Sequence, residues 1–531
     1  MIRLFAFVLI ASAFLVSDTP ERSDWTATRT ALDVTLHAAD STADVDCKLT
    51  VRNDSRVPLS QIFLQLTSTA KWKSVVRDGV AQQFTEHRIK TDADHTGEMS
   101  EARIVLAHPL GAGATVELDI AYSISVFYEG RRLRDIGAPV DVALKTDWDR
   151  ISASFTAVRG AGYVAWYPVA LEPESMKNGN AVFREIERWK ARAAQSAFEM
   201  TTHDGGRGST KPYPRLGMTV PVLTSVVPPV VTKNGVALFA DSQAAAEAVQ
   251  FSTGAEQFAQ TWLPARSNTA KVWVLPEEGD VPFVSGSEAF VPPNITEQAA
   301  NGITLHALSN MTLASTRQWI QEGYASFLEL AYTHQERGRT AVLQMLSDRT
   351  QALAIDEPDN TDTADTSLIN SAEESRYRLK ASLAWWMLRD IVGDAALQRA
   401  IKNYKSADDR STDYMQKLVE AESHKDLGWF FSDWVYRDRG LPEFAISNAA
   451  SRKTLEGKWV TEVKIANSGG AGAVVPVTVS AGDEQESLRV QVPARGSATI
   501  SITTTFKPTH ARVNDGSVPE TDPNDNEADI K

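Results

Sequence analysis

His306 and Glu322 are the two residues of this sequence whose types best suit a chemical site. An imidazole and a carboxylate can ligate a metal ion or form an ion pair with each other. His306 has leucine neighbours, and Glu322 stands between apolar residues of a helical pattern, so both are expected to be buried. A buried carboxylate needs a partner because its removal from water is costly. The sequence therefore leaves open either a metal site or a core in which His306 hydrogen-bonds to a carbonyl group or to Glu322, with Asn310 as a further candidate partner of Glu322.

The segment WIQEGYASFLE, Trp319 to Glu329, resembles the WLNEGFASYLE-type helix of the membrane alanyl aminopeptidase family. Members of this family are gluzincin zinc metallopeptidases, and the resemblance implies that Glu322 matches their third zinc ligand. Upstream the family carries HExxH, whose two histidines face the same side of a helix and bind zinc while the glutamate activates water. This chain has HALSN there, at residues 306–310.

The alignment of HALSN with that motif implies an incomplete metal site. His306 matches the first ligand, Ala307 replaces the general base, and Asn310 stands where the second histidine belongs. The interval of 12 positions from Asn310 to Glu322 is also shorter than the family's usual spacing. A catalytic zinc needs three protein ligands and an open position, and a neutral amide is a poor zinc ligand. We therefore expect no cofactor, with zinc as the cofactor only if the site is functional.

Three further residues match positions that serve catalysis in the family. Tyr377, in SRYRLKASLAWWMLRD, matches a tyrosine whose phenol stabilises the tetrahedral intermediate, with helix packing as an equal alternative. Glu288, in SGSEAFVPP, is the candidate for the glutamate that holds the substrate's amino group, with an ordinary surface carboxylate as the alternative. Glu329 lies about two turns beyond Glu322 on the same helix face, where it either supports the metal ligands or is solvated.

These residues together imply an aminopeptidase-like protein that is catalytically inactive, a pseudo-metallopeptidase with a retained cleft for a peptide or protein ligand. The loss of a general base alone lowers a rate by about 10²- to 10⁴-fold. Two alternatives stay open. In the first, the protein is an active zinc-dependent aminopeptidase with an unusual ligand such as His334. In the second, it is a structural protein of the cell envelope whose β domains carry an interaction.

The elements that position these residues change in type along the chain. Apolar and polar residues alternate with period two up to about residue 157, which is typical of antiparallel sheet, and a helical pattern dominates between Asn294 and Arg439. With the resemblance, the pattern predicts a multidomain α+β fold: an N-terminal antiparallel β domain (18–205), a mainly α-helical thermolysin-like peptidase domain (206–443), a small C-terminal β-sandwich (444–513) and a disordered acidic tail (514–531).

Composition limits the partners and the compartment. Residues 1–17 combine Arg3, an apolar stretch and small residues, as a secretory signal peptide does. No later segment reaches the roughly 20 apolar residues of a membrane helix. The net charge of -14, without a cluster of Lys and Arg, argues against nucleic acid as a partner. The single cysteine, Cys47, cannot form an internal disulfide. We expect a secreted or periplasmic protein without a membrane span in its mature chain.

Overall fold

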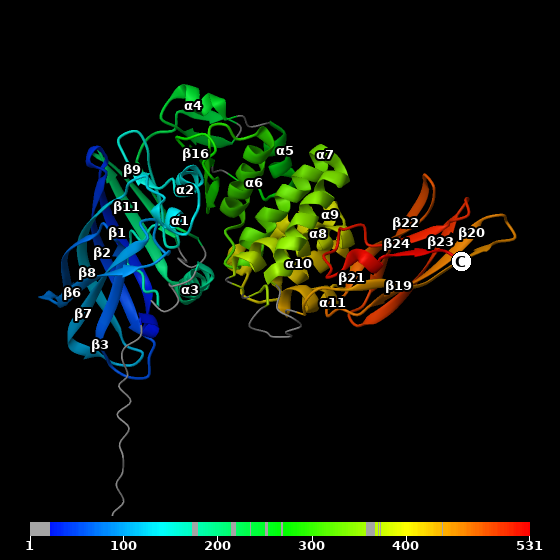
Figure 1. The fold of residues 1–531 in the computed structure, drawn as a ribbon, viewed down its shortest axis with the longest axis horizontal. Coiled ribbons are helices and arrows are strands. Elements are labelled where there is room, and N and C mark those ends of the chain that lie inside the picture. Colours follow the sequence, from blue (N-terminus) through cyan, green and yellow to red (C-terminus); the bar gives the residue numbers. More distant parts are fainter. Residues whose placement is uncertain are drawn as a thin grey trace, which may run out of the picture.

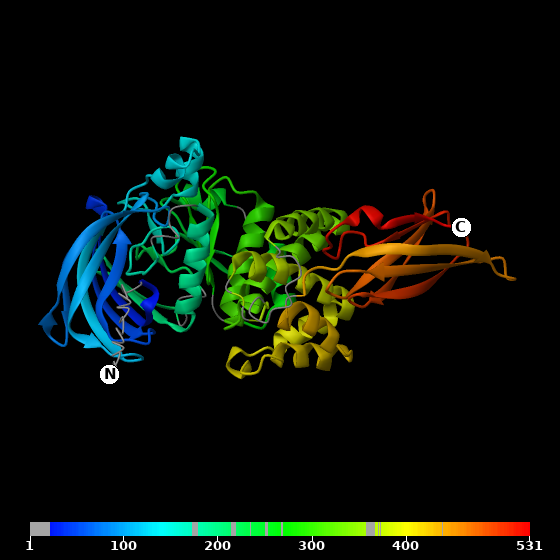
Figure 2. The same ribbon diagram turned by 60° about the horizontal axis from the view of Figure 1, so that its bottom comes forward.

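The computed structural model describes residues 22–172, 179–213, 219–233, 235–249, 253–266, 269–356, 367–369, 371, 373–437 and 439–531. They form an elongated molecule in which N-terminal β-sheets, a largely helical middle region and two C-terminal β-sheets follow one another (Figures 1 and 2). The predicted signal peptide, residues 1–17, lies outside the described residues. Within the described ranges, none of the helices combines the length and the apolar character that a membrane crossing requires.

The N-terminal region consists of two main sheets that enclose one buried apolar cluster. The larger sheet has the order β12-β11-β1-β2-β8-β4-β5, and the smaller has the order β3-β7-β6. Side chains of β8 alternate between exposed and buried, as the period of two predicts. The strands are β1 (Trp25–His37), β2 (Thr42–Asn53), β3 (Leu59–Thr67), β4 (Lys71–Arg77), β5 (Val80–Ala81), β6 (Gln83–Lys90), β7 (Glu98–Leu110), β8 (Thr115–Ser125), β11 (Ala197–Asp204) and β12 (Arg207–Tyr213).

Two features of these sheets differ from the sequence-based expectation. The pairing of β1 with β11 is parallel, whereas the other pairs of both sheets are antiparallel. A parallel pair requires a long connection, which the chain between these two distant strands supplies. In addition, β11 and β12 form a hairpin across the boundary predicted between residues 205 and 206, so the sheet continues to Tyr213.

The middle region combines a five-stranded sheet, of order β14-β15-β16-β18-β17, with helices. Helix α6 packs on β16, β17 and β18, and α7 packs on α6 and on the following helices. The strands are β14 (Val231–Lys233), β15 (Val236–Phe239), β16 (Ala270–Val274), β17 (Phe283–Ser285) and β18 (Glu288–Val291). The helices are α4 (Gln243–Ala248), α5 (Thr253–Trp262), α6 (Glu297–Leu313), α7 (Gln318–Asp356), a π-helical turn η7 (Ser375–Lys380), α8 (Ala381–Val392), α9 (Asp394–Asn403), α10 (Tyr414–Ser423), α11 (Gly428–Phe431) and a second π-helical turn η9 (Ser432–Tyr436).

The remaining elements are a small three-stranded sheet of order β13-β10-β9 and several short helices and turns, some of which lie in sequence between β8 and β11. They are α1 (Arg131–Asp135), α2 (Val140–Thr146), β9 (Arg150–Ile151), β10 (Thr156–Arg159), α3 (Gly179–Arg192), β13 (Val222–Thr224) and the 3₁₀ turns η1 (Arg22–Asp24), η2 (Ala38–Asp40), η4 (Ala193–Gln195), η8 (Ser406–Asp408) and η10 (Pro523–Asp525).

Gly323 explains how two helical segments come close enough to build the candidate site. A Cβ atom at this position would lie 2.5 Å from Cβ of Ala381 and 2.9 Å from the carbonyl oxygen of Tyr377. Any side chain here would push η7 and α8 away from α7. Glycine after Glu322 therefore lets the start of α7 contact η7 directly.

The C-terminal region consists of two sheets whose buried side chains belong to the same apolar cluster as the helices. Their orders are β19-β20-β23 and β22-β21-β24-β25. The segment 514–531 is not a disordered tail, because its strand β25 pairs with β24 and its residue Val518 is buried. The strands are β19 (Phe444–Lys453), β20 (Trp459–Asn467), β21 (Ala473–Ala481), β22 (Glu484–Val492), β23 (Gly496–Thr504), β24 (His510–Val513) and β25 (Glu527–Asp529).

Candidate functional site

Glu322, near the start of α7, is the centre of a buried polar cluster. Nε2 of His306 lies 2.9 Å from Oε2 of Glu322, and Nδ2 of Asn310 donates to Oε1 at 2.8 Å. His306 and Asn310 are four residues apart on α6, so their side chains share one face of that helix. Both side chains therefore contact the carboxylate of Glu322, which is the arrangement that the sequence left open beside a metal site.

Arg378, on η7, brings a positive charge to the same carboxylate. Its Nε donates to Oε2 of Glu322 at 3.1 Å, and its Nη1 donates to Oε1 of Glu374 at 2.5 Å. Burial alone would raise the pKa of Glu322, but attraction to Arg378 and then to His306 outweighs burial and lowers this pKa to about 2. The lowered pKa favours the ionised form of Glu322, and the chain itself supplies a cation that pairs with it.

The donor set around Glu322 does not fit a catalytic zinc ion. His306 and Glu322 offer two ligand atoms, but Asn310 turns its amide N–H group, which cannot ligate a metal, toward the carboxylate. The guanidinium of Arg378 contacts the same Glu322 oxygen that faces the imidazole, and a dication there would be repelled by it. Among the described residues, no group of three or more His, Cys, Asp or Glu side chains could hold a metal ion.

Ala307, at the position that the resemblance assigns to the general base, is fully buried within the apolar cluster of the helices. A methyl group can neither accept nor donate a proton, so this position offers no acid–base chemistry. Glu329 lies on the other side of His306, with its Oε1 4.0 Å from the imidazole Nδ1. Its carboxylate pairs with Arg349 at 3.0 Å. Glu329 is therefore close to the cluster but is held mainly by its own arginine.

Tyr377 lies beside Arg378 at the edge of a small hollow of about 40 Å³, which we call the arginine hollow. Glu322 and Lys190 also line it. The tyrosine side chain is buried, and burial raises the pKa of its phenol. A second space of about 320 Å³, the histidine hollow, shares the lining residue Arg378 with the arginine hollow and is also lined by His306. Tyr377 thus faces the polar cluster from within a narrow space.

Glu288, on β18, is buried and lies beside a larger hollow of about 390 Å³, which we call the lysine hollow. Its Oε2 accepts a hydrogen bond from Nζ of Lys211 at 2.9 Å, and its Oε1 lies 3.4 Å from Nζ of Lys271. Burial lowers the pKa of Lys211, an effect that the attraction to Glu288 opposes. Glu288 therefore already has two ammonium partners, where the resemblance implies a free carboxylate for a substrate's amine.

His334, the alternative zinc ligand, lies elsewhere on α7. Its Nδ1 is 3.0 Å from Nη2 of Arg389, and its ring packs edge-on against Trp386. Twelve residues of helix separate it from Glu322, which corresponds to about 18 Å along the axis. His334 cannot complete a ligand set with His306 and Glu322.

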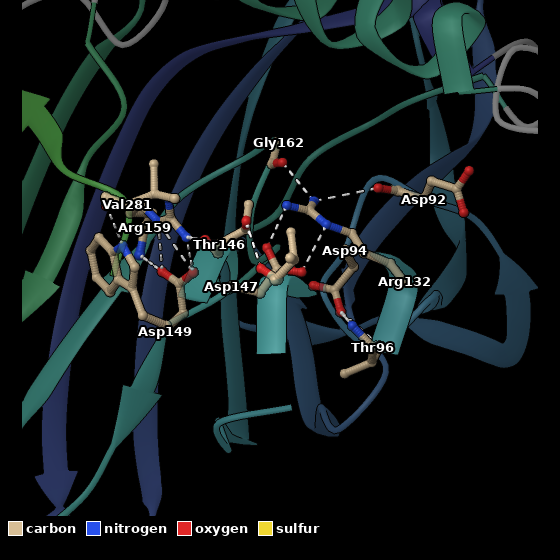
Figure 3. A network of polar contacts seen from close by, with 12 residues as sticks. Asp92, Asp94, Thr96, Arg132, Thr146, Asp147, Asp149, Arg159, Gly162 and Val281 are labelled. Atoms are coloured by element: carbon tan, nitrogen blue, oxygen red, sulfur yellow. Dashed lines mark hydrogen bonds and ion pairs between the residues drawn. The ribbon is translucent and has the colours of Figure 1, made fainter. Parts of the chain in front are cut away.

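Two buried ion pairs, drawn in Figure 3, lie beside Tyr163. Arg159 donates from Nη2 to Oδ2 of Asp149 at 2.7 Å, and Arg132 donates from Nη2 to Oδ1 of Asp147 at 2.7 Å. The guanidinium of Arg159 also lies 3.9 Å from the ring centre of Tyr163, which lines both hollows. The network therefore fixes the position of Tyr163 opposite Arg378.

Sequence reasoning missed the three cations that neutralise the two carboxylates. Arg378 lies 56 residues from Glu322, and Lys211 lies 77 residues from Glu288. Lys271 is a neighbour of Glu288 in the register of β16 and β18. No local spacing reveals such partners. A usable signal existed only for Arg378, because a buried glutamate requires a cation when metal ligands are missing.

Comparisons with known proteins identify the fold but not a family by sequence. No protein-family model and no curated protein matches the chain. Among solved structures, the chain is similar to aminopeptidase A of Legionella pneumophila in complex with aspartic acid, with 11% identity, a TM-score of 0.53, and coverage of 93% of this chain and 59% of that chain. The chain thus spans 59% of the length of that protein and shares its aminopeptidase fold.

A second group of similar structures comes from Deinococcus radiodurans. Its M1 zinc metallopeptidase has 15% identity and a TM-score of 0.41, with coverage of 79% of this chain and 95% of that chain. A point mutant of that enzyme bound to a Tyr-Ser-Ala substrate has 16% identity and a TM-score of 0.41, with coverage of 79% of this chain and 96% of that chain. These neighbours are zinc metallopeptidases; at such low identity, function must be argued from the site itself.

Proposed function

We propose that this protein is an exported, catalytically inactive pseudo-metallopeptidase whose aminopeptidase-like fold retains a cleft for a peptide or protein ligand. The contact between Arg378 and Glu322 is the observation that carries the proposal. It places the positive charge that balances the glutamate on the chain itself, so Glu322 needs no metal ion. With Ala307 at the position that the resemblance assigns to the general base, this position has no side chain that could activate water.

The retained cleft is supported by three adjoining hollows. The lysine and arginine hollows share Ser285 and Gly286, and the arginine and histidine hollows share Phe283 and Val284. All three hollows therefore lie along β17, which is an edge strand of its sheet. An extended peptide can bind to an edge strand by adding a further strand, with its side chains in neighbouring pockets.

The fold is compatible with the same ligand class. The Legionella aminopeptidase, whose fold this chain shares, was solved in complex with aspartic acid, which carries the amino and carboxylate groups found in peptides. Within this proposal, residues 1–17 act as a signal peptide, and Glu322, His306 and Asn310 are structural.

The test combines a hydrolysis assay with a binding assay on the purified full chain. With excess zinc, aminoacyl reporter substrates are expected to stay intact, while calorimetry with short peptides is expected to show binding without turnover. Ile303 lines the histidine hollow, so Ile303→Trp should fill that hollow and weaken binding. Leu488→Trp, at an exposed position on β22, is the matched control and should leave binding unchanged.

Two results would contradict this proposal in different ways. Chelator-sensitive hydrolysis would establish the active zinc aminopeptidase instead. Failure of every peptide to bind, in a chain that is folded, would favour the structural envelope protein.

A further inference from the structure

The lysine hollow lies where the N-terminal and middle regions meet. Lys211 comes from β12, Lys271 from β16 and Glu288 from β18, and Ser315 from the turn between α6 and α7 closes another side. With about 390 Å³ it has room for a side chain or a chain terminus of a ligand. Its only charged lining residues within the described part of the chain are the two lysines and the glutamate.

The two lysines have different roles toward Glu288. Nζ of Lys211 donates to Oγ1 of Thr224 at 2.8 Å and to Glu288 at 2.9 Å, and its side chain is only 16% exposed. Lys271 is 43% exposed, and its ammonium lies 3.4 Å from the other carboxylate oxygen. An ammonium has three N–H donors. Lys211 is therefore the fixed counter-ion of Glu288, and Lys271 retains donors that can point into the hollow.

Two carboxylates that are linked to lining residues of the hollow by hydrogen bonds have cationic partners of their own. Glu322, which accepts a hydrogen bond from the lining residue Asn310, pairs with Arg378 at 3.1 Å. Asp409 accepts a hydrogen bond from Tyr404 and pairs with Arg317 at 2.9 Å. Among the described lining residues, two ammonium groups and one carboxylate consequently leave one positive charge in the lysine hollow.

From this charge balance we infer that the lysine hollow is a carboxylate-binding pocket of the cleft, and that Lys271 is its ligand-binding residue. The inference rests on the proposed peptide-binding function and deepens it. The ligand is a peptide whose carboxylate, from an acidic side chain or from the C-terminus, pairs with Lys271. Because Glu288 is already paired with two ammonium groups, a free amine of a ligand is disfavoured in this hollow.

The test titrates the full chain with three peptides of equal length and with acetate as a small anionic probe. One peptide has an acidic side chain and an amidated C-terminus, the second is neutral with a free C-terminus, and the third is neutral and amidated. One or both of the carboxylate peptides should bind about tenfold more tightly than the third, and added salt should reduce that advantage. Which of the two binds more tightly identifies the source of the carboxylate.

Variants of Lys271 assign the effect to the lysine hollow. Lys271→Met should abolish the advantage of the carboxylate peptides and the binding of acetate, and Lys271→Arg should retain most of both. Lys464→Met, at an exposed position on β20, is the matched control and should change neither. Equal binding of all three peptides would overturn the inference of a carboxylate pocket, and so would an advantage of the carboxylate peptides that survives Lys271→Met. Either result would leave the proposed peptide-binding function standing. If acetate binds in a Lys271-dependent way but no peptide does, the proposed peptide-binding function fails while the anion pocket stands; if nothing binds, both fail.

Discussion

Glu322 and Glu288 are two buried carboxylates on the same cleft, exposed by only 6% and 5%, and each is neutralised by cations from distant parts of the chain. Around Glu322 the partners are His306, Asn310 and Arg378, and the adjoining arginine hollow measures only about 40 Å³. Around Glu288 a partly exposed lysine borders a hollow of about 390 Å³. Burial of the carboxylate is therefore common to the structural site at Glu322 and the proposed binding site at Glu288. The two sites differ more in the partners of the cation than in its exposure: Arg378 is 33% exposed and pairs with both Glu322 and Glu374, whereas Lys271 is 43% exposed and, among the described residues, pairs with Glu288.

The largest effect on stability is expected from removing the cation of the closed site. Arg378→Met leaves the Glu322 charge buried without its main counter-ion and should lower the free energy of unfolding by about 3 to 5 kcal/mol, measured by urea denaturation. As a control, Arg399→Met breaks the more exposed pair with Glu422 and should cost less than about 1 kcal/mol. Equal losses in the two variants would mean that the Glu322 site is not a buried ion pair.

The pH dependence of stability should reveal the ionised carboxylate of Glu322. The pKa of Glu322 is lowered from 4.5 to about 2 in the folded protein. Its stabilising contribution is thus complete above about pH 4.5 and is lost as the pH falls toward 2, which corresponds to roughly 3 kcal/mol. Between pH 6 and pH 2.5 the wild type should lose correspondingly more stability than Glu322→Gln. Parallel curves for the two proteins would contradict the assignment.

The sequence predicted the order of the β and helical regions, because periodicity is a local signal. It indicated the contacts of His306 and Asn310 with Glu322 only as an alternative to a metal site. It did not predict Arg378 at Glu322 or the two lysines at Glu288. Those partners are set by how α7 meets η7 and how β12 meets β18, and such tertiary contacts leave no spacing along the chain. The acidic end of the chain was wrongly predicted to be disordered, since its composition is polar while its pairing with β24 depends on a distant strand.

A smaller effect on stability is expected for the imidazole than for the guanidinium. His306→Ala removes one hydrogen bond to Glu322, while Arg378 and Asn310 remain, so the loss should be about 2 kcal/mol in urea denaturation. A loss as large as that of Arg378→Met would show that His306, and not Arg378, carries most of the compensation.

The smallest effect on stability is expected at the open site. Because Lys271 is 43% exposed and Lys211 keeps its contact with Glu288, Lys271→Met should change the free energy of unfolding by less than about 1 kcal/mol. Lys211→Met, which removes the buried partner, should cost more than Lys271→Met. The reverse order in thermal or urea unfolding would remove the distinction between a fixed counter-ion and a ligand-binding lysine.

Zinc content tests the central claim most directly, namely that Arg378 takes over the charge balance of Glu322 and leaves no catalytic metal site. The full chain, purified without chelator, supplied with excess zinc and then dialysed, should contain well under one zinc per molecule by elemental analysis. The double variant Asn310→His/Arg378→Met restores a His, His, Glu ligand set without the competing guanidinium and is expected to take up zinc, which makes it the positive control. Stoichiometric zinc in the wild type would contradict the account.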